Sequence, residues 1–160
     1  MKNIKAVALD VDGVLTDGTF IWGPEGEEFK QFSFLDIMGI SRASKAGLIF
    51  ALISGEDTPL VDRYARKMGI VDVYKGSKDK AASLKVFAQK NGLALEAVCF
   101  MGDDINDIEA LDLAGLSAVP ASAHPAAIDH ADLVMKASGG RGAVRELLDI
   151  LILVKSKGIV

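Results

Sequence analysis

The 160-residue chain contains little cysteine or histidine, with one and two residues respectively. A single cysteine excludes an intrachain disulfide, and we expect Cys99, which lies inside an apolar run, to be an inert core residue. We expect His124 and His130 to have surface or helix-capping roles. The composition therefore excludes a disulfide scaffold and argues against a histidine-based catalytic centre.

Long apolar runs and excess positive charge are also lacking. No apolar stretch approaches the ~20 residues that a membrane-spanning helix needs, and the N-terminal sequence does not have the layout of a signal peptide. The formal net charge is −4, and no basic stripe is visible that could replace the counterions of a nucleic acid. We therefore expect a cytoplasmic protein that binds neither membranes nor nucleic acids.

What the chain does contain is an alternation of short apolar runs with segments of helical periodicity. Strands are predicted at 6–9, 49–54, 71–74, 98–101, 116–119 and 133–135, and helices at 37–46, 59–68, 78–91, 105–114 and 143–155. This alternation predicts an α/β fold, a Rossmann-like three-layer sandwich with a central parallel sheet. Half of the residues are hydrophobic, enough for one proper core, so we expect a single domain over residues 1–160.

Acidic residues gather directly after two of the predicted strands. Asp10 and Asp12 follow the first strand in AVALDVDGVLTDG, and Asp103, Asp104 and Asp107 follow the fourth strand in VCFMGDDIND. Because ligands of open α/β sheets gather beyond the carboxyl ends of the strands, we expect the two clusters to converge on one site. Like charges this close repel one another, and Mg²⁺, a hard cation that prefers oxygen, is their natural partner. The sequence therefore predicts a magnesium site.

Two further residues complete a set of motifs that resembles a known family. Ser54 ends the second strand in LIFALIS, and Lys80 lies in KGSKDKAASL. In this order, the four motifs resemble those of the haloacid dehalogenase-like phosphatases, which have DxD, a Ser or Thr, a Lys and an acidic GDDxxD. Lys78 competes with Lys80, but only Lys80 directly follows Asp79, as the family pattern requires. Turn preferences explain any single motif, but not all four in order.

This resemblance implies a magnesium-dependent hydrolysis in two steps. Asp10 would attack phosphorus and carry an aspartyl-phosphate. Asp12 would protonate the leaving alcohol and then deprotonate the attacking water. The Asp10 carboxylate, the Asp12 backbone carbonyl and Asp103 would hold Mg²⁺, which would neutralise the phosphate charge.

The resemblance also implies roles for the remaining motif residues. Ser54, Lys80 and backbone N–H groups of the turn after Asp10 would bind the phosphoryl oxygens. Asp104 and Asp107 would orient metal-bound waters or Lys80 from behind the first layer of ligands. The alternative for Ser54 is that it only caps the following helix.

The segment 19–34 interrupts the alternation. Two aromatic, extended runs flank Gly23-Pro24-Glu25-Gly26, which predicts a β-hairpin insertion directly after the first acidic turn. A lone hairpin has too little partner surface to bury its aromatic residues, which are Phe20, Trp22, Phe29, Phe32 and Phe34. Since no large cap insertion is present to close the site, we expect another subunit to cover the hairpin. The alternative is packing against its own domain.

Three local features resemble one branch of the family, the capless phosphatases of 2-keto-3-deoxy sugar acids. These features are DVDGVLTDG with its hairpin, GDDINDIEAL, and GGRGAVRELLDILIL at 139–153. The resemblance implies a homotetramer in which a neighbour completes the pocket. Its lead substrate is 3-deoxy-D-manno-octulosonate 8-phosphate, and the alternative is a nine-carbon acid phosphate of the sialic acid type. A lipopolysaccharide precursor and a sialic acid-like surface glycan are both open as products of the pathway.

The choice between the two substrates depends on Glu56, Lys67 and the segment 35–39. The octulosonate enzymes commonly have Arg after the Ser-Gly of the second motif and RDGxG after the hairpin. This chain has Glu56 after Ser54 and Gly55, and LDIMG at 35–39. Glu56 with Lys67 resembles the nine-carbon subgroup, where a carboxylate would accept hydrogen bonds from sugar hydroxyls. Arg141 of the glycine-rich segment is a candidate for the substrate carboxylate.

Two other classes of protein share part of this pattern. A phospho-signalling receiver domain also has α/β winding, aspartates, a hydroxyl residue and a lysine, but its phosphoacceptor ends the third strand. A non-catalytic assembly module of the same fold would have lost a motif aspartate, and none is lost here. The sequence therefore predicts a phosphoric monoester hydrolase.

Overall fold

A parallel sheet of six strands forms the centre of the computed structural model, which describes residues 3–156. The strands lie in the order β5-β4-β1-β6-β7-β8, and every neighbouring pair is parallel. Their bounds are β1 (Ala6–Leu9), β4 (Ile49–Ile53), β5 (Asp72–Tyr74), β6 (Val98–Met101), β7 (Leu116–Val119) and β8 (Leu133–Val134). The chain adds β4 and β5 on one side of β1 and then returns to add β6, β7 and β8 on the other side. This order places β1 at the topological switch, where α/β folds bind their ligands.

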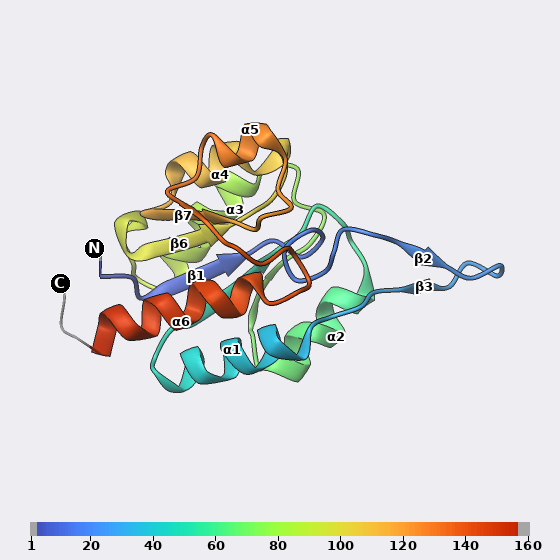
Figure 1. The fold of residues 1–160 in the computed structure, drawn as a ribbon, viewed down its shortest axis with the longest axis horizontal. Coiled ribbons are helices and arrows are strands. Elements are labelled where there is room, and N and C mark those ends of the chain that lie inside the picture. The colour runs from blue at the N-terminus through green and yellow to red at the C-terminus, as the bar shows by residue number, and fades with distance from the viewer. Residues whose placement is uncertain (1–2, 157–160) are drawn as a thin grey trace.

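Helices cover both faces of this sheet (Figure 1). One face carries α1 (Phe34–Lys45), α2 (Pro59–Met68) and α6 (Ala143–Ser156), and the other carries α3 (Lys80–Lys90), α4 (Ile108–Leu113) and α5 (Pro125–Ile128). Along β1, Val7 and Leu9 are buried on the first face, whereas Ala6 and Ala8 are buried on the second. The period of two sends alternate side chains to opposite cores. The predicted three-layer α/β sandwich is confirmed.

Helices α1 and α6 are joined at their N-terminal ends by a buried carboxylate. Asp36, in the first turn of α1, accepts hydrogen bonds from the backbone N–H groups of Gly142 (3.3 Å) and Arg145 (2.8 Å) at the start of α6. Burial raises the pKa of Asp36, although these backbone donors oppose the rise. Because the bonds satisfy N–H groups that have no partner within α6, Asp36 fixes where α6 begins.

The predicted hairpin extends from the body beyond the carboxyl ends of the sheet strands (Figure 1). Its two short strands, β2 (Ile21–Trp22) and β3 (Glu28–Phe29), are antiparallel, with Ile21 opposite Phe29 and Trp22 opposite Glu28. Trp22 is 73% exposed and Phe29 is 56% exposed. Within residues 3–156 no insertion forms a large cap over the strand ends. The exposed aromatic residues of the hairpin thus lie at the end of the molecule where the sheet strands have their carboxyl ends.

The hairpin is shorter than the predicted segment 19–34. Phe34 begins α1, because the Ser33 side chain accepts from the backbone N–H of Leu35 and caps this helix. Phe32 also differs from the prediction, since its ring stacks on that of Tyr64 in α2 at 4.3 Å. Packing on its own domain therefore holds for Phe32.

Other helix boundaries also differ from the predictions. The helix predicted at 105–114 is divided into a 3₁₀ turn, η2 (Ile105–Asp107), and α4, because the Asp107 side chain turns back onto the backbone. Helix α3 begins at Lys80 rather than 78, since Asp79 caps it by accepting from the Ala82 N–H. Two short elements, η1 (Leu95–Ala97) and α5, were not predicted. Among the described residues, no helix combines the length and apolar character needed to cross a membrane.

Candidate active site

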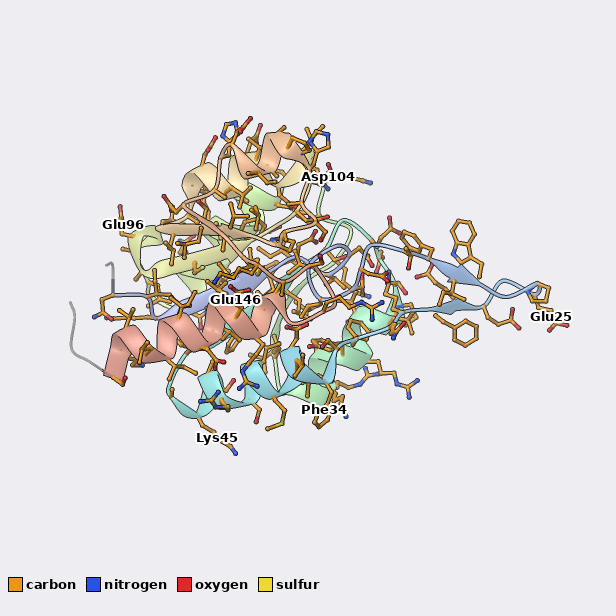
Figure 2. The ribbon with its side chains drawn as sticks, viewed as in Figure 1. Glu25, Phe34, Lys45, Glu96, Asp104 and Glu146 are labelled. Carbon is orange, nitrogen blue, oxygen red and sulfur yellow. The ribbon has the colours of Figure 1, made fainter. Side chains whose placement is uncertain are left out.

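Three strand ends bring the sequence motifs together. Leu9, the last residue of β1, is paired with Leu52 of β4 and Met101 of β6, so the residues that follow these strands share one edge of the sheet. They line a pocket of about 230 Å³, formed by Asp10, Asp12, Gly18, Phe20, Ser54, Gly55, Glu56, Lys80, Asp103, Asp104 and Asn106. Figure 2 shows Asp104 at the end of the body from which the hairpin extends, with Glu25 at the hairpin tip. The predicted convergence of the two acidic clusters is confirmed.

The turn after Asp10 is closed by the side chain of Thr16. Its Oγ1 accepts from the backbone N–H groups of Gly13 (3.3 Å) and Gly18 (3.2 Å) and donates to Asp12 Oδ1 at 3.3 Å. Gly13 has φ +88°, and a Cβ there would lie 1.9 Å from Asp103 Oδ2. Glycine is therefore required at this position for both its conformation and the close approach of the turn to Asp103.

Lys80 is the central cation of the pocket. Its Nζ lies 3.0 Å from Asp10 Oδ2 and 2.6 Å from Asp107 Oδ1, and all three residues are almost completely buried. Burial alone would lower the pKa of Lys80, but the two carboxylates outweigh it and raise this pKa. Lys80 therefore remains an ammonium group directed at Asp10. Lys78, the competing residue, lies before the helix and is exposed.

Asp107 holds the acidic turn after β6 in shape. Its Oδ2 accepts from the backbone N–H groups of Asp103 (2.8 Å) and Asp104 (3.1 Å), while its Oδ1 binds Lys80. Asp104 Oδ1 in turn accepts from the Ile105 N–H at 2.7 Å. The bonds of Asp107 orient both Asp103 and Lys80, which agrees with the supporting role predicted for it.

The carboxylates of the pocket form a site that fits a hard cation. Asp10, Asp103 and Asp107 each place one oxygen within 4.8 Å of the others. Burial and the charge of Asp107 raise the pKa of Asp10 well above its ordinary value, even though Lys80 opposes the rise. The same two causes raise the pKa of Asp103 to about 6. One lysine does not offset this accumulation of negative charge, and a divalent cation bound by oxygen ligands would.

Ser54 lies where the sequence placed it, at the end of β4 and almost completely buried. Its Oγ accepts from the Glu56 N–H at 3.1 Å, whereas the residue that caps α2 is Thr58, which accepts from the Leu60 N–H. The capping alternative for Ser54 is therefore wrong. The hydroxyl hydrogen of Ser54 is left available to a ligand in the pocket.

Two predicted substrate residues lie outside this pocket. Lys67 lines a second cavity of about 300 Å³, between α2 and the hairpin. Arg141 lies in the glycine-rich segment before α6, with its guanidinium 3.8 Å from Asp17 Oδ2. The glycines around it serve close packing as well, because a Cβ at Gly139 would lie 1.8 Å from the carbonyl oxygen of Gly13. The structure therefore brings Glu56 to the acidic centre of its own chain, but not Lys67 or Arg141.

Sequence reasoning missed three residues that contact this centre. Thr16 and Lys30 bind Asp12, and Asn106 lines the pocket. Asn106 is part of the quoted GDDIND motif, and Thr16 is part of DVDGVLTDG. Successive residues of a strand point to opposite faces, so an exposed Phe29 implies that Lys30 points the other way. This alternation is the signal that could have identified Lys30.

Cys99 and the two histidines lie where the sequence predicted. Cys99 is completely buried in β6, and burial raises the pKa of its thiol. His124 caps α5 by accepting from the Ala126 N–H at 3.1 Å, and His130 pairs with Asp112 on the surface. These predictions are confirmed.

Comparison with known proteins assigns the family. The sequence profile of the haloacid dehalogenase-like hydrolases matches residues 23–147. The chain is 40% identical over 156 residues to the 3-deoxy-D-manno-octulosonate 8-phosphate phosphatase of Salmonella typhi, an alignment that covers 98% of this chain and 83% of the relative. The chain therefore belongs to the haloacid dehalogenase-like hydrolases, as its motifs predicted.

Solved structures resemble the whole described fold. The 3-deoxy-D-manno-octulosonate 8-phosphate phosphatase of Moraxella catarrhalis, determined in complex with magnesium, phosphate and the free sugar acid, has a TM-score of 0.93 at 33% identity and covers 99% of this chain and 92% of its own. The phosphatase of the same name from Yersinia pestis has a TM-score of 0.95 at 35% identity, covering 98% and 84%. Both likenesses support the fold described above over nearly the whole chain.

Proposed function

We propose that this protein is a magnesium-dependent phosphatase of a 2-keto-3-deoxy sugar-acid phosphate, with 3-deoxy-D-manno-octulosonate 8-phosphate as its lead substrate. The observation that carries the proposal is the pocket at the strand ends, where Asp10, Lys80 and Asp103 surround one space. The relatives of that name, at 40% identity over nearly the whole chain, support the substrate class.

The proposed reaction has two displacements at phosphorus. An oxygen of Asp10 forms a bond to phosphorus while the bond to the sugar oxygen breaks, and Asp12 gives a proton to that oxygen. Water then attacks the aspartyl-phosphate, Asp12 takes the proton of the water, and Asp10 is released. The Asp10 carboxylate, the Asp12 backbone carbonyl and Asp103 would hold Mg²⁺, which would supply the charge that lets an anionic nucleophile approach a phosphate.

Lys80 and Ser54 would bind the phosphoryl oxygens during both displacements. Lys80 is held by Asp10 and Asp107 before any substrate arrives, so little reorganisation is required when negative charge develops. Ser54 is fixed by its bond from the Glu56 N–H. Asp104 and Asp107 would orient metal-bound waters and Lys80.

A nine-carbon substrate of the sialic acid type is the alternative, and one observation favours it. Glu56 lines the pocket, where its carboxylate can accept hydrogen bonds from the hydroxyl groups of a sugar tail. An arginine at this place would instead seek the carboxylate of the sugar acid.

We further propose a cytoplasmic homotetramer in which neighbours cover the hairpins and complete the pockets. The exposed Trp22 and Phe29 support this assembly. In it, Lys67 and Arg141 would reach the substrate of a neighbouring chain, since neither lines the pocket of its own chain.

The test compares kcat/KM for the eight-carbon and nine-carbon phosphates in the presence of Mg²⁺. We expect the preferred acid to be favoured at least about tenfold, because a site that hydrogen-bonds one substrate leaves polar groups unpaired with the other. Asp10→Asn should lower the rate on either substrate at least about 10³-fold, with the fold intact, because it removes the nucleophile. Near-normal turnover by this variant would overturn the proposed mechanism.

A further inference from the structure

Lys30 of the hairpin is a buried lysine that reaches into the active site. It follows β3, and its side chain is completely buried. Its Nζ lies 2.6 Å from Asp12 Oδ1, 3.6 Å from Glu28 Oε1, and 4.4 Å from the centre of the Phe20 ring, which lines the pocket. Because a buried ammonium group is costly unless it is paired, the ion pair with Asp12 is the main compensation for burying this residue.

The two carboxylate oxygens of Asp12 differ in their hydrogen-bond partners. Oδ1 accepts from both Lys30 Nζ (2.6 Å) and Thr16 Oγ1 (3.3 Å). Oδ2 is shielded from solvent and has no hydrogen-bond partner among the described residues. Two donors from different segments therefore hold one oxygen, and the other accepts no hydrogen bond from the described residues.

The contacts of Lys30 also connect this carboxylate to the hairpin. Glu28, opposite Trp22 in the hairpin, lies beside the lysine and accepts from the Trp22 indole N–H at 3.2 Å. A chain of polar contacts thus runs from the exposed Trp22 through Glu28 and Lys30 to Asp12. The position of Lys30 depends on the hairpin being formed, because Lys30 and Glu28 belong to that segment, whereas Asp12 belongs to the turn after β1.

We propose that Lys30 is a positioning residue for acid–base chemistry by Asp12. This inference rests on the proposed phosphatase function. Lys30 holds Oδ1 and thereby fixes the orientation of the carboxylate that gives a proton to the leaving oxygen in the first displacement and takes one from water in the second. The hairpin therefore contributes to the chemical step itself, in addition to any contact with a second subunit. A merely structural lysine would affect all substrates alike.

The leaving group of the substrate separates these two roles. The sugar phosphate releases an alkoxide unless its oxygen is protonated, whereas p-nitrophenyl phosphate releases a stable phenolate that needs little help from an acid. For Lys30→Met, kcat/KM on the sugar phosphate should fall about tenfold or more relative to kcat/KM on p-nitrophenyl phosphate. Lys30→Arg, which retains a donor cation, should recover most of that ratio. Since the ratio is taken within one preparation, it does not depend on the folded fraction.

Lys45→Met is the matched control, because Lys45 is an exposed lysine in the last turn of α1, away from the hairpin (Figure 2). It should leave the ratio unchanged. An equal fall on both substrates for Lys30→Met, or no fall, would overturn the positioning role. If the wild type hydrolyses p-nitrophenyl phosphate but neither sugar-acid phosphate, the substrate proposal fails. The ratio is then measured with another alkyl phosphate that the wild type hydrolyses, so Lys30 is still tested.

Discussion

The strand-end pocket and the hairpin lie side by side, but they are stabilised in different ways. In the pocket, Asp10, Lys80 and Asp107 are buried and joined by ion pairs at 3.0 and 2.6 Å. In the hairpin, only two residue pairs form the ladder, and Trp22 and Phe29 face outward. An isolated two-stranded ribbon is marginal in water.

This difference separates two requirements of the proposed enzyme. Phosphoryl transfer needs charges held in place before the substrate arrives, and the parallel strand ends supply them. In the proposed assembly, recognition of a sugar acid would use a surface that a neighbour completes, and the exposed hairpin would supply that surface. Through its ion pair with Asp12, Lys30 connects the weakly supported hairpin to the strand-end pocket.

The largest effect should follow from removing the cation of the pocket. Lys80→Met would leave the buried Asp10 and Asp107 without their ion pairs, so we expect it to lower the free energy of unfolding by about 3 to 5 kcal/mol. Turnover should fall at least about 10²-fold. Urea denaturation and steady-state kinetics measure the two effects. Lys78→Met, at an exposed neighbouring lysine, should change stability by less than about 0.5 kcal/mol. Equal effects of the two substitutions would contradict the assignment of Lys80.

An intermediate effect should appear in the pH dependence of the free energy of unfolding, measured in excess chelator. Burial and Asp107 raise the pKa of Asp103 from 3.8 to about 6, so ionising Asp103 opposes folding. Its destabilisation is absent below about pH 4, grows as the pH rises to about 6, and is complete above that. Asp103→Asn should therefore gain stability over the wild type by on the order of 2 kcal/mol between pH 4 and pH 7.

Mg²⁺ should reverse this difference, since it stabilises the wild type and has lost a ligand in the variant. Thermal denaturation at several pH values, with and without Mg²⁺, measures both effects. Glu25→Gln, at the exposed hairpin tip, is the control and should show neither (Figure 2). A difference between Asp103→Asn and the wild type that stays constant with pH would show that Asp103 ionises normally.

The smallest effect on the chain itself should come from the exposed aromatic residues of the hairpin. Trp22→Ser combined with Phe29→Ser should change the unfolding free energy of the isolated chain by less than about 0.5 kcal/mol, because both residues are exposed. It should nevertheless give smaller species in size-exclusion chromatography. Phe32→Ser is the contrasting variant and should cost roughly 1 to 3 kcal/mol, since Phe32 stacks on Tyr64. A double variant that elutes as the wild type does would exclude these aromatics from the assembly.

The strand and helix pattern could be predicted because burial on alternate faces leaves a clear period in the sequence. All six strands of the sheet were located to within a residue or two, and the acidic residues after β1 and β6 marked the site. The short helices η1 and α5 were not predicted. Helix α5 has four residues, which is too few for a periodic pattern, although His124 followed by Pro125 was a usable signal for its start.

Side-chain contacts between distant segments could not be predicted in the same way. Arg42 forms an ion pair with Asp149, 107 positions away, and Lys30 forms one with Asp12, 18 positions away. No local sequence pattern indicates either pair. Asp36 likewise lies in the segment 35–39, whose local sequence gives no sign that its carboxylate is buried and accepts hydrogen bonds from the start of α6. Such contacts depend on how helices and loops pack, which the sequence period does not describe.

By itself, the sequence determined the class of fold and the chemical identity of the site, because strand periodicity and acidic residues after strands are local properties. The tertiary structure decided which oxygen and which ammonium group face each other. It brought Lys80, already favoured by its motif, within 3.0 Å of Asp10, separated Lys67 from the acidic pocket and placed Lys30 on Asp12. The physical reason is that ion pairing requires contact within a few ångströms, and only the packed sheet, helices and hairpin bring these atoms that close.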